Sequence, residues 1–346
     1  MISDQSFGEM QKPSKEFANT QAASRNFVWT YESPWVISSL NFSYQPSQLL
    51  QIGIGSSETH QSLSHLQIVR LLPQETRFAV VDDVSLTSQV SKLMWVPDFS
   101  GRCPNILATA SDCLRIWNCD GKVKLESSLL HDPSGGAASY LNSLDWNFVD
   151  PKIIGTASKD KTCIIWDIER RTPLKQIQAH NQEVNDFAFA ENPNIFSTVG
   201  SDCSVRVFDL RNLEECSVIY QSKQMNPYKK VSWNKIDPDT LAVVSSHSPE
   251  VELFDVRMPG SPVVTLKRHE KPVTSMAWAP NSNCYICTGG RDNAVYIWEL
   301  KYKTGEVTEP YMMYKACSDI NAVVWNEIYQ DCIGIAFENC LQVLQL

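Results

Sequence analysis

The sequence predicts an all-β fold, a seven-bladed β-propeller closed by a strand near the N-terminus. Two separate series of short motifs recur along the 346 residues, and each series gives seven units. A period of about 40–45 residues is typical of propellers whose blades contain four strands. No stretch shows a sustained helical period, so we expect very little helix.

The first series is an apolar pair followed by an acidic or amide residue. Its aromatic members lie 42 to 49 residues apart. The five members are Ile116-Trp117-Asn118, Ile165-Trp166-Asp167, Val207-Phe208-Asp209, Leu253-Phe254-Asp255 and Ile297-Trp298-Glu299. Gln67-Ile68-Val69 and Gln342-Val343-Leu344 lie about one period before and after them. An aromatic residue followed by Asp at this period is the signature of a WD repeat.

The second series consists of short β-prone runs that end in an aromatic residue, 43 to 53 residues apart. The seven runs are Leu40-Asn41-Phe42, Leu93-Met94-Trp95, Leu144-Asp145-Trp146, Phe187-Ala188-Phe189, Val231-Ser232-Trp233, Met276-Ala277-Trp278 and Val323-Val324-Trp325. Because two unrelated motifs give the same number, we interpret each unit as one blade.

The third unit illustrates the four strands of a blade. Residues 139–146, 152–157, 162–167 and 173–177 form short runs rich in Ile, Thr and aromatic residues. Turn-forming residues separate these runs, as expected for antiparallel neighbours.

The last unit needs a strand from elsewhere, because it supplies three strands, at 320–325, 332–337 and 341–345. The apolar, β-prone run Phe27–Tyr31 precedes the first repeat. We predict that it pairs with the last strand and covers an edge that would otherwise promote aggregation. The propeller then spans residues 26–346, and the polar residues 1–25 are expected to form a disordered tail.

Charge and hydropathy exclude several classes of function. Thirty Lys and Arg against 39 Asp and Glu give a net charge of −9, which argues against direct binding of nucleic acid or of an anionic membrane. Lys229-Lys230 is a basic pair rather than a patch. No apolar stretch approaches the ~18 residues of a membrane-spanning helix, and the N-terminus lacks the features of a secretory signal.

Eleven scattered cysteines without a signal peptide predict reduced thiols and a cytoplasmic and nuclear protein. The single CxxC motif, Cys284 to Cys287, lies in a strand-like stretch where positions i and i+3 face opposite sides. We therefore expect no metal site and no cofactor, and we expect a monomer. Glycine-rich phosphate loops, His-Glu-x-x-His and Gly-x-Ser-x-Gly are all absent, which predicts a protein that is not an enzyme.

Some polar residues have the spacing of buried hydrogen-bond networks. They are His131, Ser158, Asp160 and Trp166 in the third unit, His180 and Asp202 in the fourth, and His269, Asp292 and Trp298 in the sixth. Ser158, His131 and Asp160 could also be read as a catalytic triad. A catalytic site occurs once, however, whereas these groups recur with the repeat, so we interpret them as structural. On this interpretation Asp160→Ala lowers the melting temperature.

Two tetrads, Phe208-Asp-Leu-Arg211 and Phe254-Asp-Val-Arg257, follow the aromatic–Asp ending in neighbouring units. One interpretation is that each Arg folds back onto its Asp or onto a backbone carbonyl. The other is that the arginines stand on one face as anchors for a partner, since Arg is favoured at interface hot spots. The candidate partner-binding residues are Asp209, Arg211, Asp255 and Arg257.

Further segments across most of the chain give the sequence a more specific resemblance. They include Tyr31-Glu-Ser-Pro34, Leu144-Asp-Trp-Asn147, Cys163-Ile-Ile-Trp-Asp-Ile-Glu169, Trp233-Asn-Lys235, Ala277-Trp-Ala-Pro280 and Ile333-Gly-Ile-Ala-Phe337. The chain resembles the WD-repeat family of the plant Transparent Testa Glabra and anthocyanin-regulating proteins. The animal member of this family is a DDB- and cullin-associated factor.

This resemblance implies a non-catalytic scaffold or adaptor that assembles regulatory complexes. Plant members hold basic helix-loop-helix and Myb-type transcription factors together, and the animal member resembles an adaptor for dual-specificity kinases. The alternative is a substrate receptor of a cullin–RING ubiquitin ligase. The two tetrads resemble the box by which WD-repeat receptors engage the cullin adaptor, with Phe instead of the usual Trp at positions 208 and 254.

Overall fold

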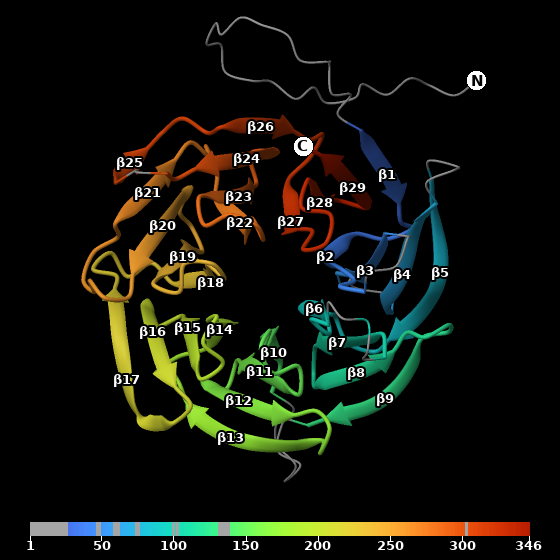
Figure 1. Ribbon diagram of the computed structural model, residues 1–346, viewed down its shortest axis with the longest axis horizontal. Helices are drawn as coiled ribbons and strands as arrows, with labels where there is room; N and C mark the ends of the chain where they lie inside the picture. Colours follow the sequence, from blue (N-terminus) through green and yellow to red (C-terminus); the bar gives the residue numbers. More distant parts are fainter. Residues whose placement is uncertain are drawn as a thin grey trace, which may run out of the picture.

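A computed structural model describes residues 27–45, 50–57, 63–72, 77–98, 101, 104–130, 139–301 and 304–346. Seven β-sheets are arranged as a ring (Figure 1), and residues of their seven inner strands line a central channel. The described residues contain no helix, and the predicted seven-bladed, all-β propeller is confirmed. The predicted tail at residues 1–25 lies outside the described residues.

The first four blades each contain four consecutive strands, ordered from the channel outward. Blade 1 comprises β2 (Ile37–Phe42), β3 (Gln51–Ser56), β4 (Ser64–Leu72) and β5 (Arg77–Leu86), and blade 2 comprises β6 (Lys92–Trp95), β7 (Ile106–Ala110), β8 (Leu114–Asn118) and β9 (Lys124–Leu129). Blade 3 comprises β10 (Leu141–Trp146), β11 (Ile153–Ser158), β12 (Thr162–Asp167) and β13 (Thr172–Gln178). Blade 4 comprises β14 (Val184–Phe189), β15 (Ile195–Gly200), β16 (Ser204–Asp209) and β17 (Asn212–Gln221).

The last three blades depart from this simple order at their outer strands. Blade 5 comprises β18 (Tyr228–Trp233), β19 (Thr240–Ser245), β20 (Glu250–Asp255), β21 (Val264–Lys267) and the added β25 (Gly305–Val307); blade 6 comprises β22 (Val273–Trp278), β23 (Tyr285–Gly290), β24 (Ala294–Glu299) and β26 (Met312–Lys315); blade 7 comprises β27 (Ile320–Trp325), β28 (Cys332–Phe337), β29 (Cys340–Gln345) and β1 (Val28–Glu32).

The apolar core lies between neighbouring blades. The aromatic residues that end the seven inner strands are all buried, and they are Phe42, Trp95, Trp146, Phe189, Trp233, Trp278 and Trp325. Outer strands are more exposed; six of the seven residues of β13, for example, face solvent. The motif that revealed the repeat is thus the one that fills the space between sheets.

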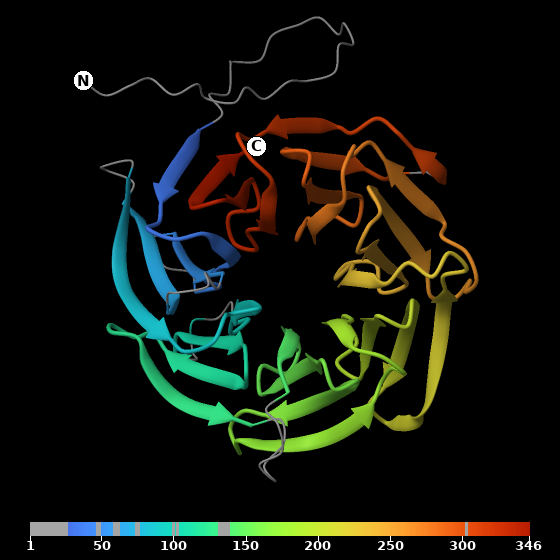
Figure 2. The same ribbon diagram turned by 180° about the vertical axis from the view of Figure 1, so that it is seen from behind.

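The N-terminal strand closes the ring, as predicted. β1 pairs antiparallel with β29 from Val28 opposite Leu344 to Glu32 opposite Cys340. The two strands lie side by side in both views of the molecule (Figures 1 and 2). The pairing gives blade 7 its fourth strand from the opposite end of the chain, so the edge of β29 is covered.

A second strand crosses from one blade to another on the rim. β25 belongs to the chain segment between β24 and β26 of blade 6, yet it pairs in parallel with β21 of blade 5 (Figure 1). Gly305 begins this strand with φ of 76°, a conformation that favours glycine. The Lys267 ammonium lies 2.6 Å from a carboxylate oxygen of Glu306 across this pair.

The two faces of the disc carry different connections, and we name them by their residues. Links from one blade to the next, and turns between second and third strands, lie on the His face, with His180 and His269. Turns between first and second strands, and between third and fourth, lie on the opposite Arg face, with Arg211 and Arg257.

A ring of hydrogen bonds joins successive inner strands where the channel opens on the His face. In six blades a short polar side chain donates to a backbone oxygen near the start of the next inner strand. The bonds run from Ser38 to Val90 (3.3 Å), Ser91 to Leu141 (2.6 Å), Asn142 to Val184 (2.8 Å), Asn185 to Tyr228 (2.7 Å), Thr274 to Ile320 (2.5 Å) and Asn321 to Ile37 (2.9 Å). We call this set the inner hydrogen-bond ring.

Candidate protein-interaction sites

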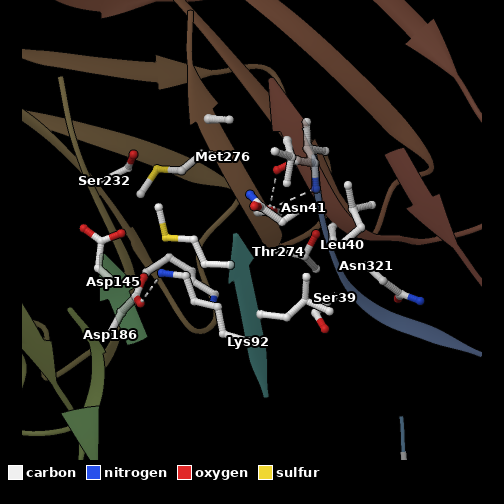
Figure 3. A pocket seen from close by; sticks show the side chains of 18 of the residues that line it. Ser39, Leu40, Asn41, Lys92, Asp145, Asp186, Ser232, Thr274, Met276 and Asn321 are labelled. Atoms are coloured by element: carbon white, nitrogen blue, oxygen red, sulfur yellow. Dashed lines mark hydrogen bonds and ion pairs between the residues drawn. The ribbon is translucent and has the colours of Figure 1, made fainter. Parts of the chain in front are cut away.

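The central channel holds a cavity of about 740 Å³ lined by residues of all seven inner strands. Polar side chains of several strands point into it, among them Asn41, Lys92, Asp145 and Asp186 (Figure 3). Inner strands supply these groups because alternate residues of each strand face the channel, while the others pack between blades.

Buried charges in the channel lie in two groups. Nearer the His face, the Lys92 ammonium lies 3.4 Å from a carboxylate oxygen of Asp186, which also accepts hydrogen bonds from the Ser143 hydroxyl and the Val231 amide. Lys92 and Lys230 hold the pKa of Asp186 below its usual value despite burial. This carboxylate is therefore ionised and links blade 4 to blades 2, 3 and 5.

Nearer the Arg face, Lys235 lies 3.8 Å from Asp145. Burial raises the pKa of the neighbouring Glu327 to about 7, although Lys235 opposes that shift. The same burial lowers the pKa of Lys235 itself. This end of the channel has more carboxylates than cations among its described residues.

Blades 4 and 6 contain the expected His–Asp pairs. Nδ1 of His180 lies 2.8 Å from a carboxylate oxygen of Asp202, and Nδ1 of His269 lies 2.9 Å from Asp292. All four side chains are nearly or fully buried. Each pair joins the link between two blades to the turn between second and third strands, so it fixes a blade to its predecessor.

In blade 6 the network continues to the core. Nε2 of His269 lies 2.8 Å from the Thr288 hydroxyl, which accepts a hydrogen bond from the Trp298 indole (2.9 Å). If the Thr288 hydroxyl donates its proton to Nε2, a neutral His269 imidazole can donate from Nδ1 to Asp292. Each polar group of the network then has a hydrogen-bond partner. In blade 4, Phe208 replaces the Trp, and Arg206 instead donates to Asp202.

One hydrogen bond of the network expected in the third blade, from Trp166 to Ser158, requires a correction. The Trp166 indole donates to the Thr156 hydroxyl (2.9 Å), not to Ser158. Ser158 shares a hydrogen bond with Ser139 (2.6 Å), and Asp160 accepts from the amide and hydroxyl of Thr162. His131 lies outside the described residues.

The sequence contained a signal for this Thr position that our interpretation missed. Thr156, Thr198 and Thr288 occupy the same position of the second strand, whereas Ser158 corresponds to Gly200 and Gly290, which have no hydroxyl. A Cβ at either glycine would lie within 2.7 Å of the neighbouring His ring.

On the Arg face, both arginines of the tetrads fold onto their aspartates and remain exposed. Arg211 donates from Nε and a terminal nitrogen to Asp209 (3.0 and 2.6 Å), and its side chain is 66% exposed. Arg257 does the same with Asp255, and a second terminal nitrogen lies 3.2 Å from Asp239. The two interpretations of the tetrads are thus compatible.

These contacts fix the guanidinium groups before any partner binds. The side-chain hydrogen bonds from Arg211 and Arg257 lower the pKa of Asp209 and Asp255, so both carboxylates are ionised at neutral pH. Blades 4 and 5 are neighbours, and both turns follow the third strand. The arrangement can present two oriented cations to an acidic or carbonyl-rich partner surface.

Candidate metal ligands and cysteines add no further site among the described residues. The described residues contain no group of three or more His, Cys, Asp or Glu that could hold a metal ion. Their cysteines are free, and burial raises the pKa of the Cys287 thiol of the CxxC motif to about 12. No helix within the described ranges is long and apolar enough to cross a membrane.

Comparisons with known proteins agree with the fold. The WD40 family (WD domain, G-beta repeat) matches residues 128–167, 171–209 and 260–299. The chain is 37% identical over 322 residues to a DDB1- and CUL4-associated factor 7 homolog of Dictyostelium discoideum, covering 92% of this chain and 98% of the relative.

Two yeast proteins are more distant relatives. A WD repeat-containing protein of Schizosaccharomyces pombe is 28% identical over 320 residues, covering 83% of this chain and 73% of the relative. Another, from Saccharomyces cerevisiae, is 29% identical over 328 residues, covering 84% of this chain and 61% of the relative.

Proposed function

We propose that this chain, which belongs to the WD-repeat family of the DDB1- and CUL4-associated factor 7 homolog, is a substrate receptor of a cullin–RING ubiquitin ligase. The relative's name links it to DDB1 and CUL4, and similarity extends over nearly the whole of both chains. In this proposal the chain is non-catalytic, acts in the cytoplasm and nucleus, and docks on a DDB1-type adaptor through its Arg face.

The observation that carries the proposal is the pair of exposed, oriented arginines on neighbouring blades. Arg211 and Arg257 are 66% and 67% exposed, yet each donates hydrogen bonds from two of its nitrogens to its Asp. Ordering a long side chain on binding costs about 0.5–1.5 kcal/mol, and a side chain that is already fixed avoids much of this cost. Arginine is also among the residues that dominate interface energy.

A scaffold for transcription factors or dual-specificity kinases, as in the Transparent Testa Glabra proteins, is the second candidate. It is supported by the two faces of the disc, which carry different chemistry and leave room for two partners. Such a scaffold works by raising the effective concentration of one partner near another. The two candidates differ in whether a ligase adaptor binds.

A pull-down with purified DDB1-type adaptor separates them. Arg211→Glu with Arg257→Glu reverses both charges, and we expect adaptor binding to weaken at least about tenfold, which is ~1.4 kcal/mol. Arg170→Glu is the matched control, because Arg170 is 77% exposed and follows the third strand of blade 3 on the same face. This control is expected to bind like the unmodified chain.

Two outcomes would contradict the receptor proposal. One is unchanged adaptor binding in the double variant. The other is an unmodified chain that binds a kinase or a transcription factor but no adaptor, which would favour the scaffold.

A further inference from the structure

The inner hydrogen-bond ring is interrupted at the junction of blades 5 and 6. The ring position of blade 5 is Lys229, whereas the other blades have Ser, Thr or Asn there. The Lys229 side chain is exposed, and within the described residues it makes no hydrogen bond to blade 6. This junction therefore lacks a bond that the other six possess.

A second unpartnered cation lies beside this gap. Arg291 stands in the turn between β23 and β24 of blade 6, on the His face, and lines the cavity together with Lys229. Both residues are exposed, and in the described part of the chain neither side chain makes an ion pair or hydrogen bond. Partial burial of its ammonium, and then the nearby Arg291, lower the pKa of Lys229.

Two more lysines extend the positive charge into the channel. Lys230 and Lys92 both act on Asp186, and one carboxylate cannot neutralise two ammonium groups. Burial, Lys92 and Lys229 together lower the pKa of Lys230 in spite of Asp186. We call Lys92, Lys229, Lys230 and Arg291 the cation cluster.

The acidic residues at this end of the cavity do not cancel the cluster. Besides Asp186, the exposed Asp319 also lines the cavity near the His face. Four cations face two carboxylates here, whereas the whole chain has a net charge of −9. The Arg-face end, with Asp145, Lys235 and Glu327, has the opposite balance.

We propose that the His-face end of the channel binds an acidic peptide segment of a partner protein, whose phosphate or carboxylate side chain contacts Arg291 and Lys229. A guanidinium binds either anion in a bidentate manner, and an ammonium adds a point charge. A cavity of about 740 Å³ is within the size range of ligand pockets and accepts a few side chains. The acidic chain as a whole does not favour the long polyanion of a nucleic acid. The inference does not depend on the proposed role of the Arg face.

Fluorescence anisotropy with three labelled 11-residue peptides tests the proposal. The first has a central phosphoserine with two glutamates on each side, the second has Glu in place of phosphoserine, and the third has Ser and Gln throughout these positions. We expect the first two to bind at least about tenfold more tightly than the third. The ratio of the dissociation constants of the first two peptides shows whether the site favours phosphate or carboxylate.

The variants use residues that the chain already has at equivalent positions. Lys229→Asn copies Asn185 of blade 4, and Arg291→Ser copies Ser201. Each should weaken binding of the phosphopeptide about five- to tenfold, whereas Asp319→Asn should strengthen it about twofold. Lys175→Asn, on the exposed outer strand β13, should change nothing.

Equal binding of the three peptides, or no binding by the unmodified chain at millimolar concentration, would overturn the proposal. So would unchanged binding in Lys229→Asn and Arg291→Ser. A 12-nucleotide poly(U) RNA that displaces the phosphopeptide at lower concentration than unlabelled phosphopeptide would assign the cluster to nucleic acid instead. Thermal unfolding of each variant shows that any loss of binding is not a loss of fold.

Discussion

The junction between blades 7 and 1 and the junction between blades 5 and 6 use the same device at the rim and differ at the channel. In both, a strand from the later blade's segment pairs with the outer edge of the earlier blade, β1 on β29 and β25 on β21. At the channel, Asn321 donates to Ile37 across the first junction, and Lys229 makes no such bond across the second.

The rim strands also differ in what they cover. β1 forms five antiparallel residue pairs, and its Trp29 and Tyr31 pack against the core beside blade 1. β25 forms three parallel pairs, and two of its three residues are exposed. Ring closure therefore depends on the N-terminal strand. At the junction of blades 5 and 6 the rim strand is short, and on the channel side an exposed lysine replaces a hydrogen bond.

The largest expected effect comes from removing β1. A chain that starts at Ser33 loses five residue pairs and the packing of Trp29 and Tyr31. At about 1 kcal/mol for each net hydrogen bond, with apolar burial added, we expect a loss on the order of 5 kcal/mol. That is comparable with the total stability of many domains. Urea unfolding followed by tryptophan fluorescence measures it, and size-exclusion chromatography detects aggregation through the exposed edge of β29.

Two further variants test whether β1 contributes more to stability than β25. A chain that starts at Phe27 keeps β1 and should unfold like the full chain. Replacing residues 304–307 by Gly and Ser removes β25, and we expect a loss of less than about 2 kcal/mol, because three mostly exposed residues contribute few net hydrogen bonds. Equal losses in the free energy of unfolding on removal of β1 and of β25 would contradict the expectation that β1 contributes more.

The closing strand was predictable for two reasons. Its own residues carry a local β pattern, and the last unit visibly lacks a fourth strand. Phe27–Tyr31 is apolar and precedes the first repeat, and the last unit has three strands. The short β25 had no such signal, since three residues that include Gly305 and Glu306 carry no β pattern. The inner hydrogen-bond ring was also beyond sequence reasoning, because its acceptors are backbone atoms of the next blade.

The candidate site was predictable where partners are close in sequence. Asp209 and Arg211 lie two residues apart, and their contact follows from the turn. The approach of Asp239 to Arg257 joins two different turns and needed the fold. The cation cluster was missed because Lys229-Lys230 is a pair in the sequence, and only the channel places Arg291 and Lys92 beside it.

We expect an intermediate loss of stability when the His269–Asp292 network that links blade 5 to blade 6 is broken. His269 lies in the connection between these blades, and Asp292→Ala would leave its buried imidazole without an acceptor. We expect a loss of about 2 kcal/mol. Asp160→Ala should lower the melting temperature less, because Asp160 is exposed and accepts from Thr162.

The pH dependence of this effect has a definite sign. Although burial opposes it, the hydrogen bond from His269 helps hold the pKa of Asp292 below its usual value. A carboxylate with a depressed folded pKa stabilises the fold above its unfolded pKa of ~3.9, and this stabilisation is lost as pH falls through the folded value. Urea unfolding at pH 7, 4 and 3 should show the difference between the unmodified chain and Asp292→Ala narrowing below about pH 4. A constant difference would show that the carboxylate charge is not involved.

The smallest expected change in stability concerns Lys229. It tests whether the missing hydrogen bond of the inner hydrogen-bond ring lowers the stability of the chain in exchange for a positive charge. Lys229→Asn places an amide where Asn185 donates to Tyr228 (2.7 Å), so we expect it to add a bond to blade 6 and to stabilise the chain by about 1 kcal/mol. The mirror variant Asn185→Lys should destabilise it by a similar amount, and both are measured by urea unfolding. Loss of stability in Lys229→Asn would mean that Lys229 supports the junction through contacts of its own. A gain in stability together with weaker binding of the acidic peptide is the pattern expected of a position where binding is favoured over stability.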